Sequence, residues 1–139
     1  MKILEMCDAE AAQVAVDATA EQAIQMMLDR HVGAVAVVDE KQRVAGIFTE
    51  RDVLKRLALS GRDPRTTPVR EVMTTPVEMA TLATTAAEAL STMVERHYRH
   101  LPIVEDDGRL LGMLSIRNVL QARIEVLTRQ LDQARAVVL

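Results

Sequence analysis

The sequence feature that most limits the fold is an internal repeat, in which residues of the same type recur at one constant separation. The separation is 66 residues, the distance from Thr19 to Thr85, and it holds without a gap. The matched pairs are Thr19 and Thr85, Ala23 and Ala89, Met27 and Met93, Arg30-His31 and Arg96-His97, Val38 and Val104, Arg43 and Arg109, Gly46 and Gly112, Arg51 and Arg117, Val53 and Val119, and Leu54 and Leu120. A unit of this length cannot bury a core alone, so the two copies are predicted to pack on each other.

Each copy shows the same order of predicted elements, which is strand, helix, strand, strand and helix. We expect them at residues 12–16, 20–30, 34–38, 43–48 and 49–59 in the first copy, and at 77–81, 85–97, 101–104, 110–114 and from 115 onward in the second. The run 34–38 is wholly apolar, as in a strand covered on both faces. His31 is expected to close the first helix, with Gly33 supplying the left-handed geometry found at many helix ends.

Both copies close on a strand that turns directly into a helix. The motif is Gly46-Ile47-Phe48-Thr49-Glu50-Arg51-Asp52 in the first copy and Gly112-Met113-Leu114-Ser115-Ile116-Arg117-Asn118 in the second. Thr49 and Asp52 have the spacing of a capping box, which stabilises a helix start by about 1 kcal/mol. The same helix start, with its free N–H groups and its dipole, attracts phosphate. The structural and the ligand-binding roles are compatible, and the sequence leaves both open.

Composition narrows the classes of function. The net charge is −3 without a long basic run, and the aromatic residues are Phe48 and Tyr98, so a nucleic-acid-binding surface is not indicated. Cys7 is the only cysteine, which excludes an intrachain disulfide and fits a cytoplasmic protein. No apolar run reaches the roughly 20 residues of a membrane helix, and the N-terminus is a poor signal peptide. We find no metal-ligand, nucleophile-elbow, Walker or Rossmann motif, and we therefore expect neither a metal site nor an enzyme.

The doubled pattern resembles a tandem pair of cystathionine-β-synthase (CBS) domains, also called a Bateman module. Beside the two closing motifs, the resemblance rests on Val72-Met73-Thr74-Thr75-Pro76-Val77 and on Arg99-His100-Leu101-Pro102-Ile103-Val104-Glu105. It covers about residues 3–127, and we expect a stand-alone pair. It implies an α/β (α+β) fold of two pseudo-symmetric β-α-β-β-α repeats packed sheet to sheet, with a long C-terminal helix. The implied divisions are repeat 1 at 1–60, a linker at 61–71, repeat 2 at 72–127 and a helical extension at 128–139.

The resemblance implies that an adenosine-containing ligand, namely AMP, ADP, ATP or S-adenosylmethionine, binds in the cleft between the repeats. In this interpretation the Thr49 hydroxyl donates to a phosphate oxygen, and the Asp52 carboxylate accepts from both ribose hydroxyls. The second copy has Ser115 and Asn118 at the equivalent positions. Because Asn118 lacks the charge, we expect one better site centred on Thr49 and Asp52. No cofactor is expected to be required.

Other side chains are candidates for contacts to the rest of the ligand. Arg99 and His100 precede the strand at 101–104, where they would face the cleft and neutralise phosphates, or would simply suit a helix C-terminus and a solvated turn. Arg51, in the first helical turn, is suited to bidentate phosphate contact, although exposed helical arginines are common. The adenine slot would be lined by apolar residues that also fit a core, and the candidates are Val14, Val16, Val35 and Val37.

The last predicted helix carries an apolar stripe that needs a cover. Its members are Leu120, Ile124, Leu127, Leu131, Ala134 and Val138. Self-association is favoured, a partner protein is the alternative, and the resemblance also implies a homodimer.

Two functions fit the whole pattern. The first is a regulatory module that binds an adenine nucleotide and signals to an enzyme or transporter by a conformational shift. The second is a ligand-free pair that serves as a dimerisation or protein-interaction module. A third and weaker reading, a small phosphohydrolase, has no nucleophile or metal cluster to support it.

Overall fold

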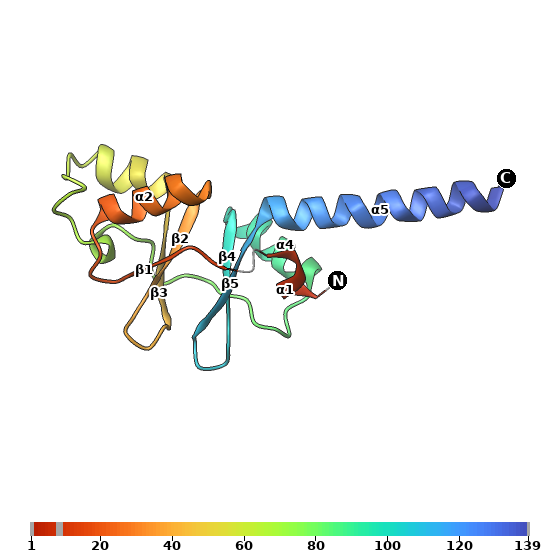
Figure 1. The fold of residues 1–139 in the computed structure, drawn as a ribbon, viewed down its shortest axis with the longest axis horizontal. Helices are drawn as coiled ribbons and strands as arrows, with labels where there is room; N and C mark the ends of the chain where they lie inside the picture. Colours follow the sequence, from red (N-terminus) through yellow and green to blue (C-terminus); the bar gives the residue numbers. More distant parts are fainter. Residues whose placement is uncertain (1, 8–9, 139) are drawn as a thin grey trace.

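The computed structural model describes residues 2–7 and 10–138, folded as two small sheets that lie side by side with helices around them (Figure 1). The first repeat contains β1 (Gln13–Ala15), α2 (Ala20–Arg30), β2 (Ala34–Val38), β3 (Val44–Thr49), α3 (Glu50–Asp52) and the π-helical η1 (Val53–Ala58). The second contains α4 (Ala86–Arg96), β4 (His100–Val104), β5 (Leu110–Ser115) and α5 (Ile116–Val138). Two short helices, α1 (Ile3–Met6) and the 3₁₀ turn η2 (Val69–Glu71), precede the first and second repeats.

The sheets have the order expected of a repeated unit. In the first, β1 runs parallel to β2 and β2 pairs antiparallel with β3; in the second, β4 pairs antiparallel with β5. This mixed α/β architecture, together with the long C-terminal helix α5, confirms the predicted fold class. Among the described residues, we find no helix that combines the length and the apolar character needed to cross a membrane.

The 66-residue repeat extends to the backbone conformation. His31 and His97 both adopt left-handed geometry, with φ of 53° and 60°, and each ends the helix of its repeat. Gln42 and Gly108, which are also equivalent, have φ of 64° and 92° in their hairpin turns. The expectation that Gly33 supplies the left-handed geometry was therefore wrong. His31 itself adopts the left-handed conformation, and its N–H donates to the carbonyls of residues 27 and 28 at the end of the helix.

Two predicted elements differ from the structure. The strand expected at residues 77–81 is reduced to one bridge, in which Ala80 pairs with Ile103. The extended backbone ends there in a turn, in which the N–H of Thr81 donates to the Thr84 hydroxyl and the N–H of Thr84 donates to the Thr81 carbonyl, both at 3.0 Å. The helix expected at 49–59 is present, but it widens after Asp52 into the π-helical η1, where the N–H of Leu59 donates to the carbonyl of Leu54.

Each repeat has its own apolar core, and each core is completed by the lead-in segment of the other repeat. The first core holds Phe48, Val35 and Val37 together with Val69 and Val72, which come from η2 and its end. The second core takes in Ile3 and Met6 of α1, and its other buried members are Ala80, Ala89, Met93, Leu101, Ile103, Leu114, Val119 and Ala122. The lead-in segments are therefore crossed, and this crossing ties the two halves together.

Two equivalent glycines allow the crossed segments to approach the strands. A Cβ on Gly46 would lie 2.6 Å from the Met73 sulfur and 2.8 Å from the backbone oxygen of Thr74. A Cβ on Gly112 would lie 2.7 Å from the sulfur of Cys7, which is the equivalent of Met73. Ile47 and Thr74 exchange backbone hydrogen bonds of 3.1 and 2.8 Å, so the backbone of Thr74 is held close to Gly46.

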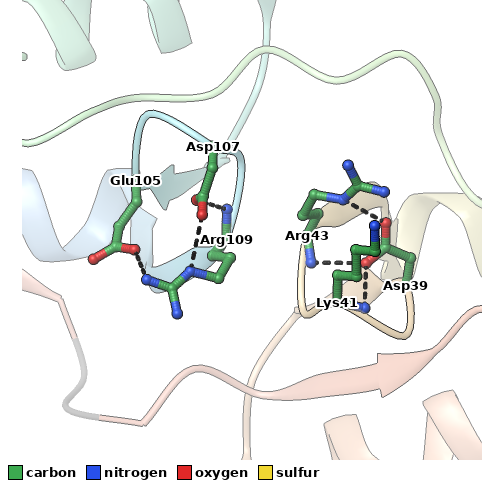
Figure 2. Close-up of polar contacts among 6 residues, drawn as sticks. All are labelled: Asp39, Lys41, Arg43, Glu105, Asp107 and Arg109. Atoms are coloured by element: carbon green, nitrogen blue, oxygen red, sulfur yellow. Dashed lines mark hydrogen bonds and ion pairs between the residues drawn. The ribbon is translucent and has the colours of Figure 1, made fainter.

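The two repeats also meet at their β-hairpins, which Figure 2 shows side by side. The N–H of Val44 donates to the Gly108 carbonyl and the N–H of Leu110 donates to the Gln42 carbonyl, both at 3.0 Å. This brings the equivalent residues Arg43 and Arg109 opposite each other.

Each of these arginines is balanced within its own turn. Arg43 pairs with Asp39 at 2.9 Å, while Arg109 pairs with Glu105 and with Asp107 (Figure 2). Backbone and side-chain hydrogen bonds from Arg43, with a further backbone bond from Lys41, lower the pKa of Asp39. The lowered pKa keeps Asp39 charged at neutral pH, so that it offsets the charge of Arg43 where the two arginines face each other.

The crossed packing predicts unequal effects of adding one methyl group to two glycines. Gly46→Ala should lower the free energy of unfolding by about 1–3 kcal/mol, because the new Cβ meets a backbone oxygen that is held in a bridge. Gly33→Ala is the control, since its Cβ would meet the flexible carboxylate of Glu50 at 2.8 Å, which can move away. Urea unfolding of both variants measures the difference, and equal losses would contradict the crossed arrangement.

Candidate functional site

The start of α3 is built by Thr49 and Asp52 as the sequence predicts. The Thr49 hydroxyl accepts from the N–H of Asp52 at 3.3 Å, and the Asp52 carboxylate accepts from the N–H of Thr49 at 3.1 Å. Thr49 is also the last residue of β3, where it pairs with Ala34. The Thr49 hydroxyl and the Asp52 carboxylate therefore lie together at the end of β3, on the edge of the first sheet. The predicted capping box is confirmed.

The Asp52 carboxylate is buried and fully engaged. Only 4% of Asp52 is exposed. The Thr74 hydroxyl donates to both carboxylate oxygens at 2.9 and 3.1 Å, the Thr49 hydroxyl donates at 3.2 Å, and the Arg56 Nε lies 3.2 Å away. A charge removed from water in this way is stable because it is paired and hydrogen-bonded.

Sequence reasoning missed two of these partners. Arg56 follows Asp52 by four residues on one helix, a spacing at which side chains commonly pair, so a signal was present. Thr74 lies 22 residues further on, in the segment before the second repeat. Thr74 reaches Asp52 only because the lead-in segments cross, and no local sequence pattern predicts that contact.

The second repeat forms the same turn with different chemistry. The Asn118 oxygen accepts from the N–H of Ser115 at 3.3 Å and from its hydroxyl at 2.7 Å, and the Ser115 hydroxyl accepts from the N–H of Asn118 at 3.0 Å. Both residues are half-buried. The residue equivalent to Thr74 would be Asp8, which lies outside the described residues. The second turn thus keeps the cap geometry and has a neutral amide in place of the carboxylate.

His100 connects the two repeats beside the start of α3. It opens β4 opposite Ser115, and its ring carbon lies 3.6 Å from where a Cβ on Gly33 would be, next to the Glu50 carboxylate. Burial lowers the pKa of His100 below its usual value of 6.5, the nearby Glu50 charge opposes this, and Arg99 adds to it. The imidazole is therefore neutral at pH 7, while Arg99 and Arg51 are exposed.

The apolar candidates are held in or against the first core. Val35 and Val37 have no exposed surface, whereas Val14 and Val16 are half-buried and pack against the same cluster. Of the four, Val14 and Val16 keep some exposed surface that a ligand can touch.

Two hollows stand out among residues 2–7 and 10–138, and neither of these two is lined by Thr49 or Asp52. One, of about 330 Å³, lies between the repeats and is bounded by Gln13, Arg30 and Leu111 among others. The other, of about 450 Å³, lies between α4 and α5. No group of three His, Cys, Asp or Glu side chains suited to a metal ion is present in the part of the chain that the structure describes.

The profile of one protein family matches most of the chain. The family described as "CBS domain" matches twice, at residues 5–59 and 69–125. A curated relative from Acidianus ambivalens, the "Uncharacterized 17.7 kDa protein in bps2 3'region", is 39% identical over 112 residues, which cover 81% of this chain and 66% of that protein. This chain spans 61% and 53% of the length of two further curated relatives.

Solved structures show the same architecture. The CBS-domain containing protein ATU1752 from Agrobacterium tumefaciens superimposes with a TM-score of 0.78 at 31% identity, covering 88% of this chain and 99% of that one. The CBS domain pair of protein MJ0100, in complex with 5'-methylthioadenosine and S-adenosyl-L-methionine, has a TM-score of 0.79 over 88% of this chain and 94% of that one. Its 18% identity shows a likeness of fold alone. The sequence repeat, the doubled fold and the two matches together show that this chain belongs to the CBS domain family and carries a tandem CBS pair.

Proposed function

We propose that this CBS pair is a regulatory module that binds an adenosine-containing ligand at the start of α3 and passes the binding event to a partner enzyme or transporter. The observation that carries the proposal is the chemistry around Asp52, whose carboxylate accepts from two hydroxyl groups, those of Thr49 and Thr74. A ribose presents two neighbouring hydroxyls of the same kind. The MJ0100 pair, which shares the fold, was solved with two adenosine compounds.

Binding in this proposal is an exchange of hydroxyl groups. The ribose takes the place of the Thr74 hydroxyl, while the backbone of Thr74 stays paired with Ile47 on β3. Because residues 69–74 join the core of the first repeat to the start of the second, the exchange alters the contact that joins the repeats. A ligand that favours the exchanged arrangement shifts the population toward it, and a partner reads that shift.

The charges around the helix start bear on the choice of ligand. Glu50 and Asp52 are acidic, so a phosphate placed there needs the cations of Arg51 and Arg99 as counter-charges, to which His100 adds a third only at acidic pH. S-adenosylmethionine carries a sulfonium cation and does not need them. AMP, ADP, ATP and S-adenosylmethionine are therefore all candidates. They differ in whether the ligand brings negative phosphates or a positive sulfonium to this acidic helix start.

The proposed state of the module is a cytoplasmic, non-catalytic homodimer. Apolar side chains are exposed at equivalent places on the helices of both repeats: Leu28 is 63% and Val94 59% exposed, and Leu54 is 65% and Leu120 47% exposed. The repeat relates Leu28 to Val94 and Leu54 to Leu120. A second copy that covers the exposed side chains of one repeat can therefore cover those of the other repeat in the same way.

One observation favours the alternative of a ligand-free interaction module. Asp52 has all its hydrogen-bond partners without a ligand, and Asn118 has lost the charge in the second repeat. In that case the Asp52 cluster is a structural cap that fastens residue 74 to the first repeat, and the exposed helix faces carry the function.

Asp52→Asn tests the proposed site without removing the cap, because the second repeat caps the same turn with Asn118. Titration calorimetry with AMP, ATP and S-adenosylmethionine should show binding to the native chain, weakened roughly 10- to 100-fold in the variant through loss of a charged hydrogen-bond acceptor. Asn118→Asp is the matched control and should not weaken that site. No heat with any adenosine compound, or equal affinity in both proteins, would reject the nucleotide proposal.

Thr74→Val tests the exchange of hydroxyl groups. Removing the competing hydroxyl should raise ligand affinity about 3- to 10-fold, the worth of one hydrogen bond. Thr75→Val is the control, because the Thr75 hydroxyl donates to the Ala45 carbonyl and does not contact Asp52. Weaker binding by Thr74→Val would mean that Thr74 holds the ligand rather than competing with it.

His100 should give phosphate binding a pH dependence. Because burial lowers its pKa, the ring gains a proton only below its usual value of 6.5, where the cation then attracts phosphate. From about pH 7.5 to about pH 5.5, the ratio of AMP to adenosine affinity should rise more in the native chain than in His100→Gln. Protonation of AMP itself, near pH about 6, affects both proteins alike and cancels in this comparison. Identical pH profiles would exclude His100 from the phosphate site.

A further inference from the structure

From Leu120 to Leu131, α5 has an apolar face whose large side chains are about half exposed. The helix runs out beyond both sheets (Figure 1). Leu120 is 47%, Ile124 63%, Leu127 55% and Leu131 52% exposed. The sequence continues the series with Ala134, which is exposed, and with Val138, whose side chain lies outside the described residues. These positions alternate by four and three residues, so that the pattern repeats every seven residues, as in a coiled coil.

We propose that this face pairs with α5 of a second copy of the chain as a parallel two-stranded coiled coil. The proposal rests on the proposed homodimer and adds which repeats meet and in which direction. In heptad positions, Leu120, Leu127 and Ala134 occupy d, while Ile124, Leu131 and Val138 occupy a. A β-branched residue such as Ile124 at a, combined with leucine at d, favours two parallel strands.

The charges beside the seam suit an identical partner. In a parallel pair each g residue faces the e residue of the other helix, which sets Arg123 against Thr128 and Gln130 against Arg135. Neither pair brings like charges together, so two identical helices meet without repulsion. The acidic residues lie at position b, away from the seam; they are Glu125 and Asp132.

The body of the molecule favours the parallel direction. The seam begins at Leu120, beside the hollow of about 450 Å³ between α4 and α5 that Leu90, Val94 and Val119 help to line. Parallel helices bring the second repeats of both copies together, so that the exposed Val94 and Leu120 are covered by the same association. An antiparallel pair would set Leu120 against the far end of the other helix and leave Val94 uncovered.

Cysteine crosslinking tests the direction. In the full chain with Cys7→Ser, single variants Leu120→Cys and Leu131→Cys should each form disulfide dimers on mild oxidation, because facing positions in a parallel pair lie within disulfide reach. Arg129→Cys, at position f on the far face, is the control and should stay monomeric on a non-reducing gel. In an antiparallel pair, a residue can face its own copy only near the point about which the two helices are symmetric, so Leu120 and Leu131 cannot both face their copies. Crosslinking at Leu131 without Leu120, or at neither, would therefore overturn the proposal.

Charge insertion separates this proposal from the nucleotide site. The double variant Leu127→Asp with Leu131→Asp should shift the mass measured by light scattering from dimer to monomer, whereas Arg129→Asp with Gln133→Asp should remain a dimer. Titration with AMP, ATP and S-adenosylmethionine should give the same affinity in both double variants, because the start of α3 lies far from this stretch along the chain. A dimer that persists in the Leu127 and Leu131 variant would overturn the coiled coil, whatever the calorimetry shows about the nucleotide.

Discussion

The fold depends on one constraint, which is that neither CBS repeat contains its whole core. Ile3 and Met6, from the lead-in segment of the first repeat, complete the core of the second, while Val69 and Val72, from the lead-in segment of the second repeat, complete the core of the first. Small units of this kind bury too little apolar surface to be stable alone. Gly46 and Gly112 are required because a side chain at either place would occupy the space of the crossed segment. The hairpin contact between Arg43 and Arg109 then fixes how the two halves face each other.

The same crossing gives the candidate site its character. Thr74 reaches Asp52 only because its segment lies along β3, so the carboxylate on which the proposed binding depends is also the anchor of the connection between the repeats. A site arranged in this way cannot be occupied without a change in that connection. In the proposed binding, the ligand replaces the contact that stabilises the empty form, so that binding and conformational shift would be one event.

The sequence was most informative where interactions are local. The repeat, the order of the elements, the cap formed by Thr49 and Asp52 and the long last helix all follow from spacing and periodicity. It was least informative where residues far apart in the chain meet. The role of Thr74 and the placement of Ile3 and Met6 in the second core needed the coordinates, because no local pattern encodes a crossing. The strand expected at 77–81 is shortened to Ala80 because the backbone turns between Thr81 and Thr84, a turn that the apolar pattern did not predict. The domain boundaries and the ligand contacts of Arg51, Arg99 and His100 stay predictions.

The crossed lead-in segments have a consequence for a chain that holds a single copy of this unit. Such a chain would lack the residues that fill the space beside the glycine equivalent to Gly46 or Gly112. Two identical chains could supply those residues only by exchanging their N-terminal lead-in segments, or arms. The present arrangement is equivalent to that arm-exchanged pair with its two members joined by the segment between Ala58 and Val69. Covalent joining raises the effective concentration of each arm for its neighbour. It also allows the two arms to diverge, so that Met73 and Cys7 now fill equivalent spaces with different side chains.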